Sequence, residues 1–160
     1  MPEKFEEFPP VQFTFCRTDS KNPDFGKLVL ELDLYLAAID GAEHAFYDQY
    51  NKTVNLNLVI LAFAGERAVG CGAGKLYAPG IMELKRMYTS TGYRGRGVAT
   101  QILLELERWA KECNCETCIL ETGVKQQPAV ALYQKCGYRP IPNYGPYEGI
   151  SNSICFEKKI

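Results

Sequence analysis

Residues 81–113 constrain the fold more than any other part of the sequence. The run Ile81–Thr89 predicts a strand, and a turn with glycines at positions 92, 95 and 97 follows it. Behind the turn, an apolar stripe at helical spacing predicts a long amphipathic helix; its members are Val98, Ala99, Ile102, Leu103, Leu106, Trp109, Ala110 and Cys113. A strand that turns directly into a half-buried helix requires a sheet with helices packed on it, which is an α/β fold.

The rest of the chain alternates strands and helices in the same way. Further strands are expected at Val11–Phe15, Leu56–Ala64, Ala68–Leu76, Thr117–Glu121, from Gly137 onward and at Ile150–Lys158. Further helices are expected over Leu28–Ile39 with a stop at Gly41, over Ala42–Tyr50 and over Pro128–Cys136. No interior linker is evident, so residues 1–160 are expected to form one domain with a mixed sheet. Gly70, Gly72 and Gly74 share one strand, where they would leave room for a ligand or a bulge, or serve only close packing.

Composition excludes several classes of protein. With 160 residues, 46% of them hydrophobic, the chain can bury a core without disulfide or metal staples. The net charge of −1 argues against nucleic acid as a partner. Seven cysteines, an odd number, favour a reducing cytoplasm, and the N-terminus lacks the pattern of a signal peptide. The longest apolar run, Leu58–Ala64, is far shorter than the roughly 20 residues of a membrane helix, so no membrane partner is expected.

The turn before the long helix could bind an anion. Glycines allow close approach of a ligand to the backbone, and the first amides of a helix are unpaired donors at the positive end of the dipole. A phosphate or pyrophosphate suits such a cradle, although a turn chosen only for packing would look the same. No Lys-Ser/Thr pair follows the last glycine, as a Walker loop requires, and Thr100 stands where a dinucleotide fingerprint has its third glycine or alanine.

The pattern Arg94-x-x-Gly97-x-Ala99 resembles the R/Q-x-x-G-x-G/A signature of the GCN5-related N-acetyltransferases, the GNAT superfamily. A second block, Ala129-x-x-Leu132-Tyr133-x-x-x-Gly137-Tyr138, is similar to the family's A-x-x-L-Y-x-x-x-G-F/Y element. The resemblance extends over roughly residues 56–159. It implies a GNAT-like fold, with a mostly antiparallel central sheet and helices on both faces, and transfer of an acetyl group from acetyl-CoA to an amine.

The resemblance also implies where acetyl-CoA binds. The pyrophosphate would lie on the loop amides, and the pantetheine arm would lie along the preceding strand, as an added strand does, at a splay next to Thr117–Glu121. Gln126 stands where the family often has Asn; the amide chemistry is the same, but the side chain of Gln126 is longer. The expected cofactor-binding residues are Met87, Tyr88, Thr89, Arg94, Gly95, Arg96, Gly97, Val98, Ala99, Thr100 and Gln126.

Two residues are expected to carry the chemistry. Tyr133 resembles the family tyrosine that protonates the departing thiolate, a role open to a phenol with a pKa of about 10; otherwise it is a core tyrosine. Glu83 lies where the histone acetyltransferases of the superfamily have a general base. As alternatives, Glu83 only attracts a cationic substrate or pairs with Lys85 or Arg86.

Glu121, Thr122 and Tyr144 are expected to contact the acceptor, or else to belong to plain connections. No metal is expected, because Cys113, Cys115 and Cys118 straddle a helix end, a turn and a strand. A catalytic triad is not expected either, because His44, the only histidine, has no Ser or Cys motif paired with it. The function that fits best is direct attack of a small primary amine on acetyl-CoA in a ternary complex. A catalytically silent CoA-binding or sensory module and a protein or peptide acetyltransferase remain as alternatives, and a homodimer is compatible with the sequence.

Overall fold

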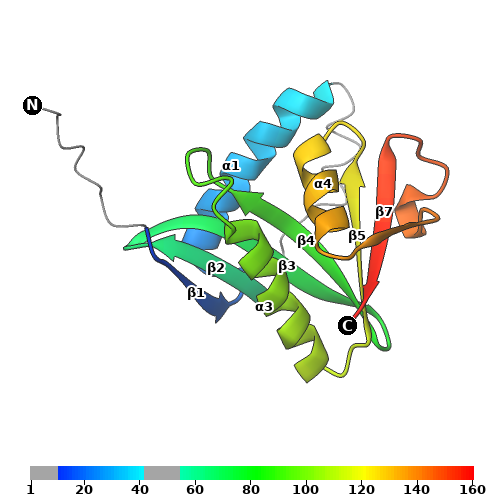
Figure 1. Ribbon diagram of the computed structural model, residues 1–160, viewed down its shortest axis with the longest axis horizontal. Coiled ribbons are helices and arrows are strands. Elements are labelled where there is room, and N and C mark those ends of the chain that lie inside the picture. Colours follow the sequence, from blue (N-terminus) through cyan, green and yellow to red (C-terminus); the bar gives the residue numbers. More distant parts are fainter. Residues whose placement is uncertain (1–10, 42–54) are drawn as a thin grey trace, which may run out of the picture.

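A seven-stranded sheet organises the computed structural model, which describes residues 11–41 and 55–160 (Figure 1). The strand order is β1-β2-β3-β4-β5-β7-β6. The strands are β1 (Phe13–Thr18), β2 (Leu58–Ala64), β3 (Arg67–Ala78), β4 (Ile81–Thr89), β5 (Thr117–Gly123), β6 (Arg139–Ile141) and β7 (Ser153–Lys159). Every neighbouring pair is antiparallel except β4 and β5, which are parallel. The expectation of a mixed, mostly antiparallel sheet is therefore confirmed.

Helices cover both faces of this sheet. Along β2, Val59 and Leu61 pack in a core cluster with α1 (Pro23–Asp40), whereas Ile60 and Ala62 pack in a second cluster with α3 (Val98–Glu112). Since side chains alternate between faces along a strand, α1 and α3 lie on opposite faces. The short helix α4 (Gln127–Lys135) contributes Tyr133 to the α3 cluster. None of the helices in the described ranges combines the length and apolarity needed to cross a bilayer.

Several element boundaries differ from those predicted. The first strand begins at Phe13 and continues to Thr18, and the strand expected from Leu56 begins at Leu58. The last strand begins at Ser153 because the chain before it is folded into a short 3-10 helix, η2 (Gly145–Tyr147), and a turn. The strand after Gly137 is only three residues long. The helix expected at Ala42–Tyr50 lies outside the described residues.

The glycines of β3 serve close packing and face a bulge. A Cβ at Gly72 would lie 2.5 Å from Met87 Sδ and 2.7 Å from Ile102 Cγ2, so only glycine lets α3 approach this closely. Opposite Gly72, β4 carries an extra residue, because Cys71 pairs with Tyr88 while Ala73 pairs with Lys85. Gly72 therefore serves close packing, one of the alternatives that the sequence left open, and the bulge lies opposite it on β4.

Candidate active site

The site begins where β4 and β5 separate. Their pairing is limited to Ile81–Glu83 with Thr117–Ile119, after which β5 continues to Gly123 paired only with β7. In Figure 1 the two strands start side by side near the C-terminus and diverge along their length. Beyond Glu83, the backbone groups of β4 that face β5 are therefore not paired with it. An extended ligand can form hydrogen bonds to such an edge, as an added strand does.

A groove with about 360 Å³ of space runs from this opening to the start of α3. It brings together ten of the eleven residues predicted to bind the cofactor: Met87, Tyr88, Thr89, Arg94, Gly95, Gly97, Val98, Ala99, Thr100 and Gln126. Arg96 does not line it; its guanidinium lies 5.7 Å from the ring centre of Tyr93. The groove is also lined by Leu32 and Tyr35 of α1 and by Leu132 and Tyr133 of α4.

The start of α3 is built to receive an anion. Its N-cap, Gly97, has the left-handed conformation with φ 81°, no side chain caps the first turn, and that turn has no acidic residue. A Cβ at Gly97 would meet nothing within 4 Å, so the space in front of the helix terminus is open. The first amides of α3 therefore point toward the groove end with the positive end of the dipole, and a pyrophosphate suits them.

Arg94 is exposed, but its side chain contacts the end of β4 and two aromatic rings. Its Nε donates a hydrogen bond to the Thr89 carbonyl oxygen at 2.9 Å. Its guanidinium lies 4.7 Å from the ring centre of Tyr35 and 5.6 Å from that of Tyr88. These contacts hold the loop against the end of β4 and leave the positive charge in the groove wall.

A second, smaller cavity of about 70 Å³ adjoins the groove. The two share Leu32, Met87, Gln126 and Tyr133, so Tyr133 lies at their junction. The smaller cavity is lined in addition by Asp40, Glu83, Lys85, Arg86, Glu121, Thr122 and Tyr147. It holds Glu83, Glu121 and Thr122, three of the residues expected on the acceptor side, and we call it the acceptor cavity.

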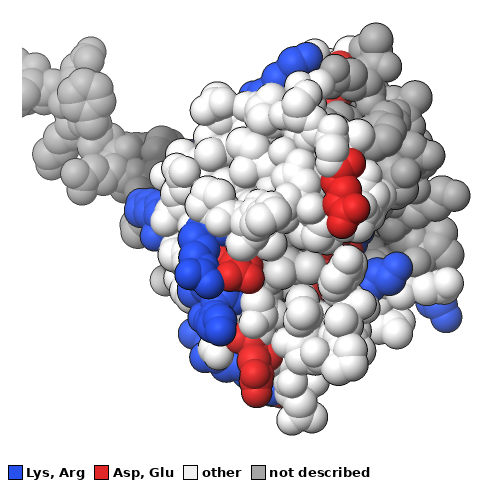
Figure 2. Space-filling model, turned by 90° about the vertical axis from the view of Figure 1, so that its right-hand side faces the viewer, with Lys and Arg blue, Asp and Glu red and all other residues white. Residues whose placement is uncertain are grey.

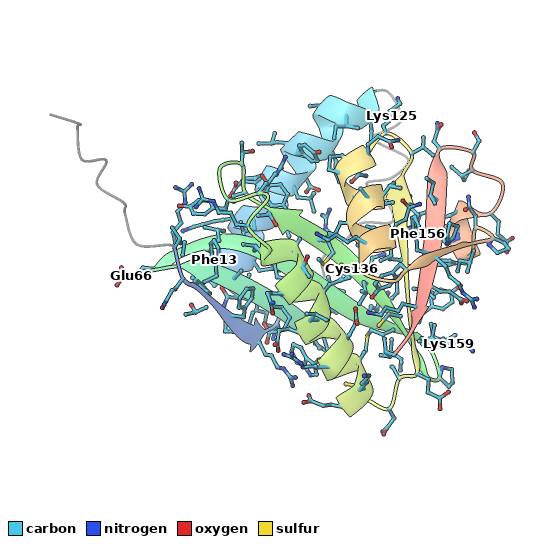
Figure 3. All side chains as sticks on the ribbon, viewed as in Figure 1. Phe13, Glu66, Lys125, Cys136, Phe156 and Lys159 are labelled. Atoms are coloured by element: carbon cyan, nitrogen blue, oxygen red, sulfur yellow. The ribbon has the colours of Figure 1, made fainter. Side chains whose placement is uncertain are left out.

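Tyr133 is almost fully buried at this junction. Its ring centre lies 5.9 Å from that of Tyr138 and 6.1 Å from that of Phe156, which is labelled in Figure 3. Burial, and to a smaller extent the nearby Glu121 carboxylate, raises the pKa of Tyr133 above its usual value. The phenol therefore keeps its proton at neutral pH.

Glu83 and Glu121 have different surroundings. Glu83 Oε2 accepts a hydrogen bond from the Tyr144 hydroxyl at 2.7 Å, and Glu83 Oε1 lies 3.4 Å from Lys85 Nζ. Through this contact, Tyr144 closes the segment 140–149 against β4. Burial raises the pKa of Glu121 to about 7, and Glu121 Oε1 is buried without a hydrogen-bond partner.

Some site residues could not be found from the sequence. Tyr35 is part of the apolar stripe of α1, so nothing in the pattern separates it from the core. Arg86 has a φ of 57° in the β4 bulge and forms an ion pair of 2.9 Å with Asp33 of α1, 53 residues away. Within the described ranges, no group of three or more His, Cys, Asp or Glu could hold a metal ion. Cys113 is exposed, whereas Cys115 and Cys118 are buried.

Comparison with known proteins agrees with this geometry. The family model described as the acetyltransferase (GNAT) family matches residues 24–138. An IAA acetyltransferase from Azospirillum brasilense is 31% identical over 137 residues, which cover 84% of this chain and 89% of that protein. The chain therefore belongs to the GNAT family, and it is an acetyl-CoA-dependent N-acetyltransferase.

Solved structures share the fold over nearly the whole chain. A Klebsiella pneumoniae protein provisionally designated an acyl-CoA N-acyltransferase has a TM-score of 0.79 and 28% identity, covering 93% of this chain and 98% of that one. The PaiA N-acetyltransferase from Thermoplasma acidophilum, solved in complex with coenzyme A, has a TM-score of 0.70 and 18% identity, covering 93% and 99%. The GNAT-like fold expected from the two sequence blocks is thus confirmed.

Proposed function

We propose that this enzyme transfers the acetyl group of acetyl-CoA to the primary amine of a small molecule, by direct attack within a ternary complex. One observation carries the proposal: the groove that ends at the uncapped start of α3 and the acceptor cavity meet at Tyr133. Donor and acceptor can therefore enter from different sides and meet at one side chain. A reaction without a covalent enzyme intermediate needs such a junction.

The groove would hold acetyl-CoA in three parts. The amides from Arg94 to Thr100 would bind the pyrophosphate, and the β4 edge at residues 87–89 would hydrogen-bond the pantetheine arm. Gln126 would reach the arm from α4, because it lines both the groove and the acceptor cavity. When bound, acetyl-CoA supplies the activated acyl group, whereas the side chains of the protein orient the two substrates and donate or accept protons.

Tyr133 would protonate the departing sulfur, since its phenol is neutral and lies at the junction. For Glu83 the sequence left two roles, proton acceptor or a carboxylate that positions the acceptor. Its bonds to Tyr144 and Lys85 favour the second role. Glu83 would then attract the ammonium group while accepting the hydrogen bond of Tyr144, which does not itself line the acceptor cavity.

The acceptor cavity supports a small amine over a polymer. Its three carboxylates, Asp40, Glu83 and Glu121, outnumber its two cationic side chains, Lys85 and Arg86, which favours an ammonium group, and its size suits a compact one. Figure 2 shows one side of the molecule, on which basic groups gather at the lower left with acidic groups beside them. The net charge of −1 gives the chain no large single-sign excess for a charged polymer.

The test is release of CoA thiol from acetyl-CoA over a panel of small primary amines, with lysine-containing peptides for comparison. Initial velocities that converge when both substrates are varied would support a ternary complex. Calorimetry with CoA measures binding independently. Faster turnover of peptides than of every small amine would favour the protein or peptide alternative, and binding without turnover would favour the silent module.

Two further expectations belong to this proposal. Seven cysteines without a disulfide among the described residues support action in the reducing cytoplasm. A homodimer stays a prediction that light scattering of the purified protein tests directly.

A further inference from the structure

We propose that Glu121 is the residue that takes the proton from the acceptor ammonium group. This assignment rests on the acetyl transfer proposed above and adds the proton acceptor to it. It follows from the position of Glu121 in the acceptor cavity and from the buried carboxylate oxygen that nothing in the described structure satisfies.

Glu121 and Tyr133 approach the junction from opposite faces of the sheet. Leu120 of β5 points into the core under α3, so Glu121 points to the face covered by α1. Tyr133 belongs to the α3 side, yet it lines the acceptor cavity and is close enough to Glu121 for that carboxylate to raise its pKa. The separation of β4 and β5 is what lets the two side chains meet. A proton acceptor and a proton donor thus flank one reaction point.

The hydrogen bonds distinguish Glu121 from Glu83. Both oxygens of Glu83 have partners, Tyr144 and Lys85. Glu121 Oε1 has none, although the Ser153 hydroxyl, which is also without a partner, lies near enough to lower the pKa of Glu121. A buried acceptor without a partner is costly, so a native site keeps one only where something else supplies the donor. An ammonium group in the acceptor cavity is such a donor.

The charged and titratable groups around Glu121 make it a base suited to neutral pH. Burial is the main cause that raises its pKa to about 7, and Asp40 of α1 and Glu83 of β4 raise it further. Lys85 of β4 and the Ser153 hydroxyl of β7 lower it, while Tyr133 of α4 and Cys155 of β7 face it as neutral groups. A base works best when its pKa lies near the operating pH.

Glu121 takes part in one proton transfer of the reaction. A protonated primary amine loses two protons when it becomes an amide. Glu121 takes the first, which frees the lone pair to form the N–C bond. As the C–S bond breaks, the sulfur leaves as a thiol with the Tyr133 proton, and the second nitrogen proton returns to the Tyr133 oxygen. Glu121 then loses its proton to solvent, and no oxidant, reductant or further reactant is needed.

The first test reads the carboxyl group directly in the free protein. Carbon NMR of protein labelled at the glutamate side-chain carboxyl should show one signal that titrates near pH 7. That signal should be missing from Glu121→Gln and present in Glu83→Gln. Melting temperature and CoA affinity of both variants serve as controls for folding and for the donor groove.

The second test compares two amines of similar size, ethylamine, which is protonated at pH 7.5, and 2,2,2-trifluoroethylamine, which is largely neutral. Glu121→Gln should lower kcat/KM for ethylamine by about 100-fold or more, as expected for loss of a positioned base, and by less than about fivefold for the fluorinated amine. With ethylamine, the parent's kcat/KM should level off above pH 7. That of Glu121→Gln should keep rising toward the pKa of the amine, about 10, because only neutral amine then reacts.

The outcomes separate the two proposals. Equal losses with both amines, or no carboxyl signal near pH 7 that depends on Glu121, would overturn the assignment of Glu121 and leave acetyl transfer standing. A parent protein that binds CoA but acetylates neither ethylamine nor any amine of the panel would overturn the proposed function, and the assignment with it. Glu83→Gln removes attraction for the ammonium group but leaves the base in place, so its defect with ethylamine should not change between pH 6 and 9.

Discussion

Replacing Gly72 with alanine tests the close contact between β3 and α3. The new Cβ would lie 2.5 Å from Met87 Sδ, 2.7 Å from Ile102 Cγ2 and 3.0 Å from Leu106 Cδ1. The Met87 thioether can move, but Ile102 is β-branched and fully buried on α3. An extra methyl group in a packed core costs about 1–3 kcal/mol, and the lower entropy of the unfolded alanine chain offsets less than about 1 kcal/mol.

Gly26→Ala is the matched control, because the same methyl group is added where it meets nothing. Gly26 is exposed on α1, and its Cβ would have no atom within 4 Å. Alanine is better than glycine in a helix by about 0.8–1.0 kcal/mol. Since 1 kcal/mol shifts the melting temperature of a domain of this size by about 2–4 °C, we expect Gly26→Ala to raise it by that amount.

Thermal and urea unfolding followed by circular dichroism measure both variants. Gly72→Ala should melt about 2–8 °C below the parent, within the range that the estimated cost allows. It should also bind CoA more weakly, because the displaced Met87 lines the groove. A Gly72→Ala protein as stable as Gly26→Ala would refute the conclusion that these glycines exist for the packing of α3.

Three further predictions concern the site. Tyr133→Phe keeps the ring but removes the proton, so kcat should fall about 10²–10⁴-fold while CoA affinity measured by calorimetry stays the same; an unchanged kcat would exclude the acid role. Gly97→Trp should abolish measurable CoA binding, whereas Arg94→Ala should weaken it by only about 1–3 kcal/mol. A folded Gly97→Trp protein that binds CoA normally would contradict pyrophosphate binding by the loop amides. Glu83→Gln should lower kcat/KM by a factor that stays constant between pH 6 and 9, as positioning requires; a defect that shrinks with rising pH would instead make Glu83 the base.

The sequence predicted the parts of the site that depend on local order. The strand, the glycine turn and α3 follow one another within residues 81–112, and the helix stripe, the turn and the motif spacing are visible without tertiary contacts. Tyr133 and its neighbours on α4 were equally accessible, since the second sequence block is contiguous. Local periodicity and motif spacing therefore predicted ten of the residues that line the groove.

The acceptor side depends on contacts between distant segments. Glu83 and Tyr144 are 61 residues apart, and Arg86 and Asp33 are 53 apart. Such pairs form only after β5 pairs with β7 and α1 covers the sheet, so no spacing along the chain indicates them. The same holds for the unsatisfied oxygen of Glu121, which is a property of what surrounds it. Sequence analysis could place Glu121 near the acceptor but could not separate its chemistry from that of Glu83.

The raised pKa of Glu121 also predicts how stability changes with pH. The folded protein holds this carboxyl neutral up to a pKa of about 7, whereas the unfolded chain ionises it at the ordinary value of 4.5. Between these two pH values the folded state therefore binds more protons than the unfolded state, and stability must fall as pH rises. At 1.36 kcal/mol for each pH unit of that interval, the loss from this group is about 3 kcal/mol by pH 8.

Glu121→Gln removes this titration while keeping the shape of the side chain. The difference in unfolding free energy between variant and parent should therefore grow by about 3 kcal/mol in favour of the variant from pH 4.5 to pH 8. Glu66→Gln, at the exposed tip of the β2–β3 turn labelled in Figure 3, is the control and should show a difference that does not vary with pH. Urea titrations at five or six pH values give these free energies. A variant whose advantage is the same at pH 4.5 and pH 8 would mean that folding does not shift the pKa of Glu121. Glu121 would then have an ordinary carboxyl pKa, and the proton-transfer assignment would lose a base suited to neutral pH.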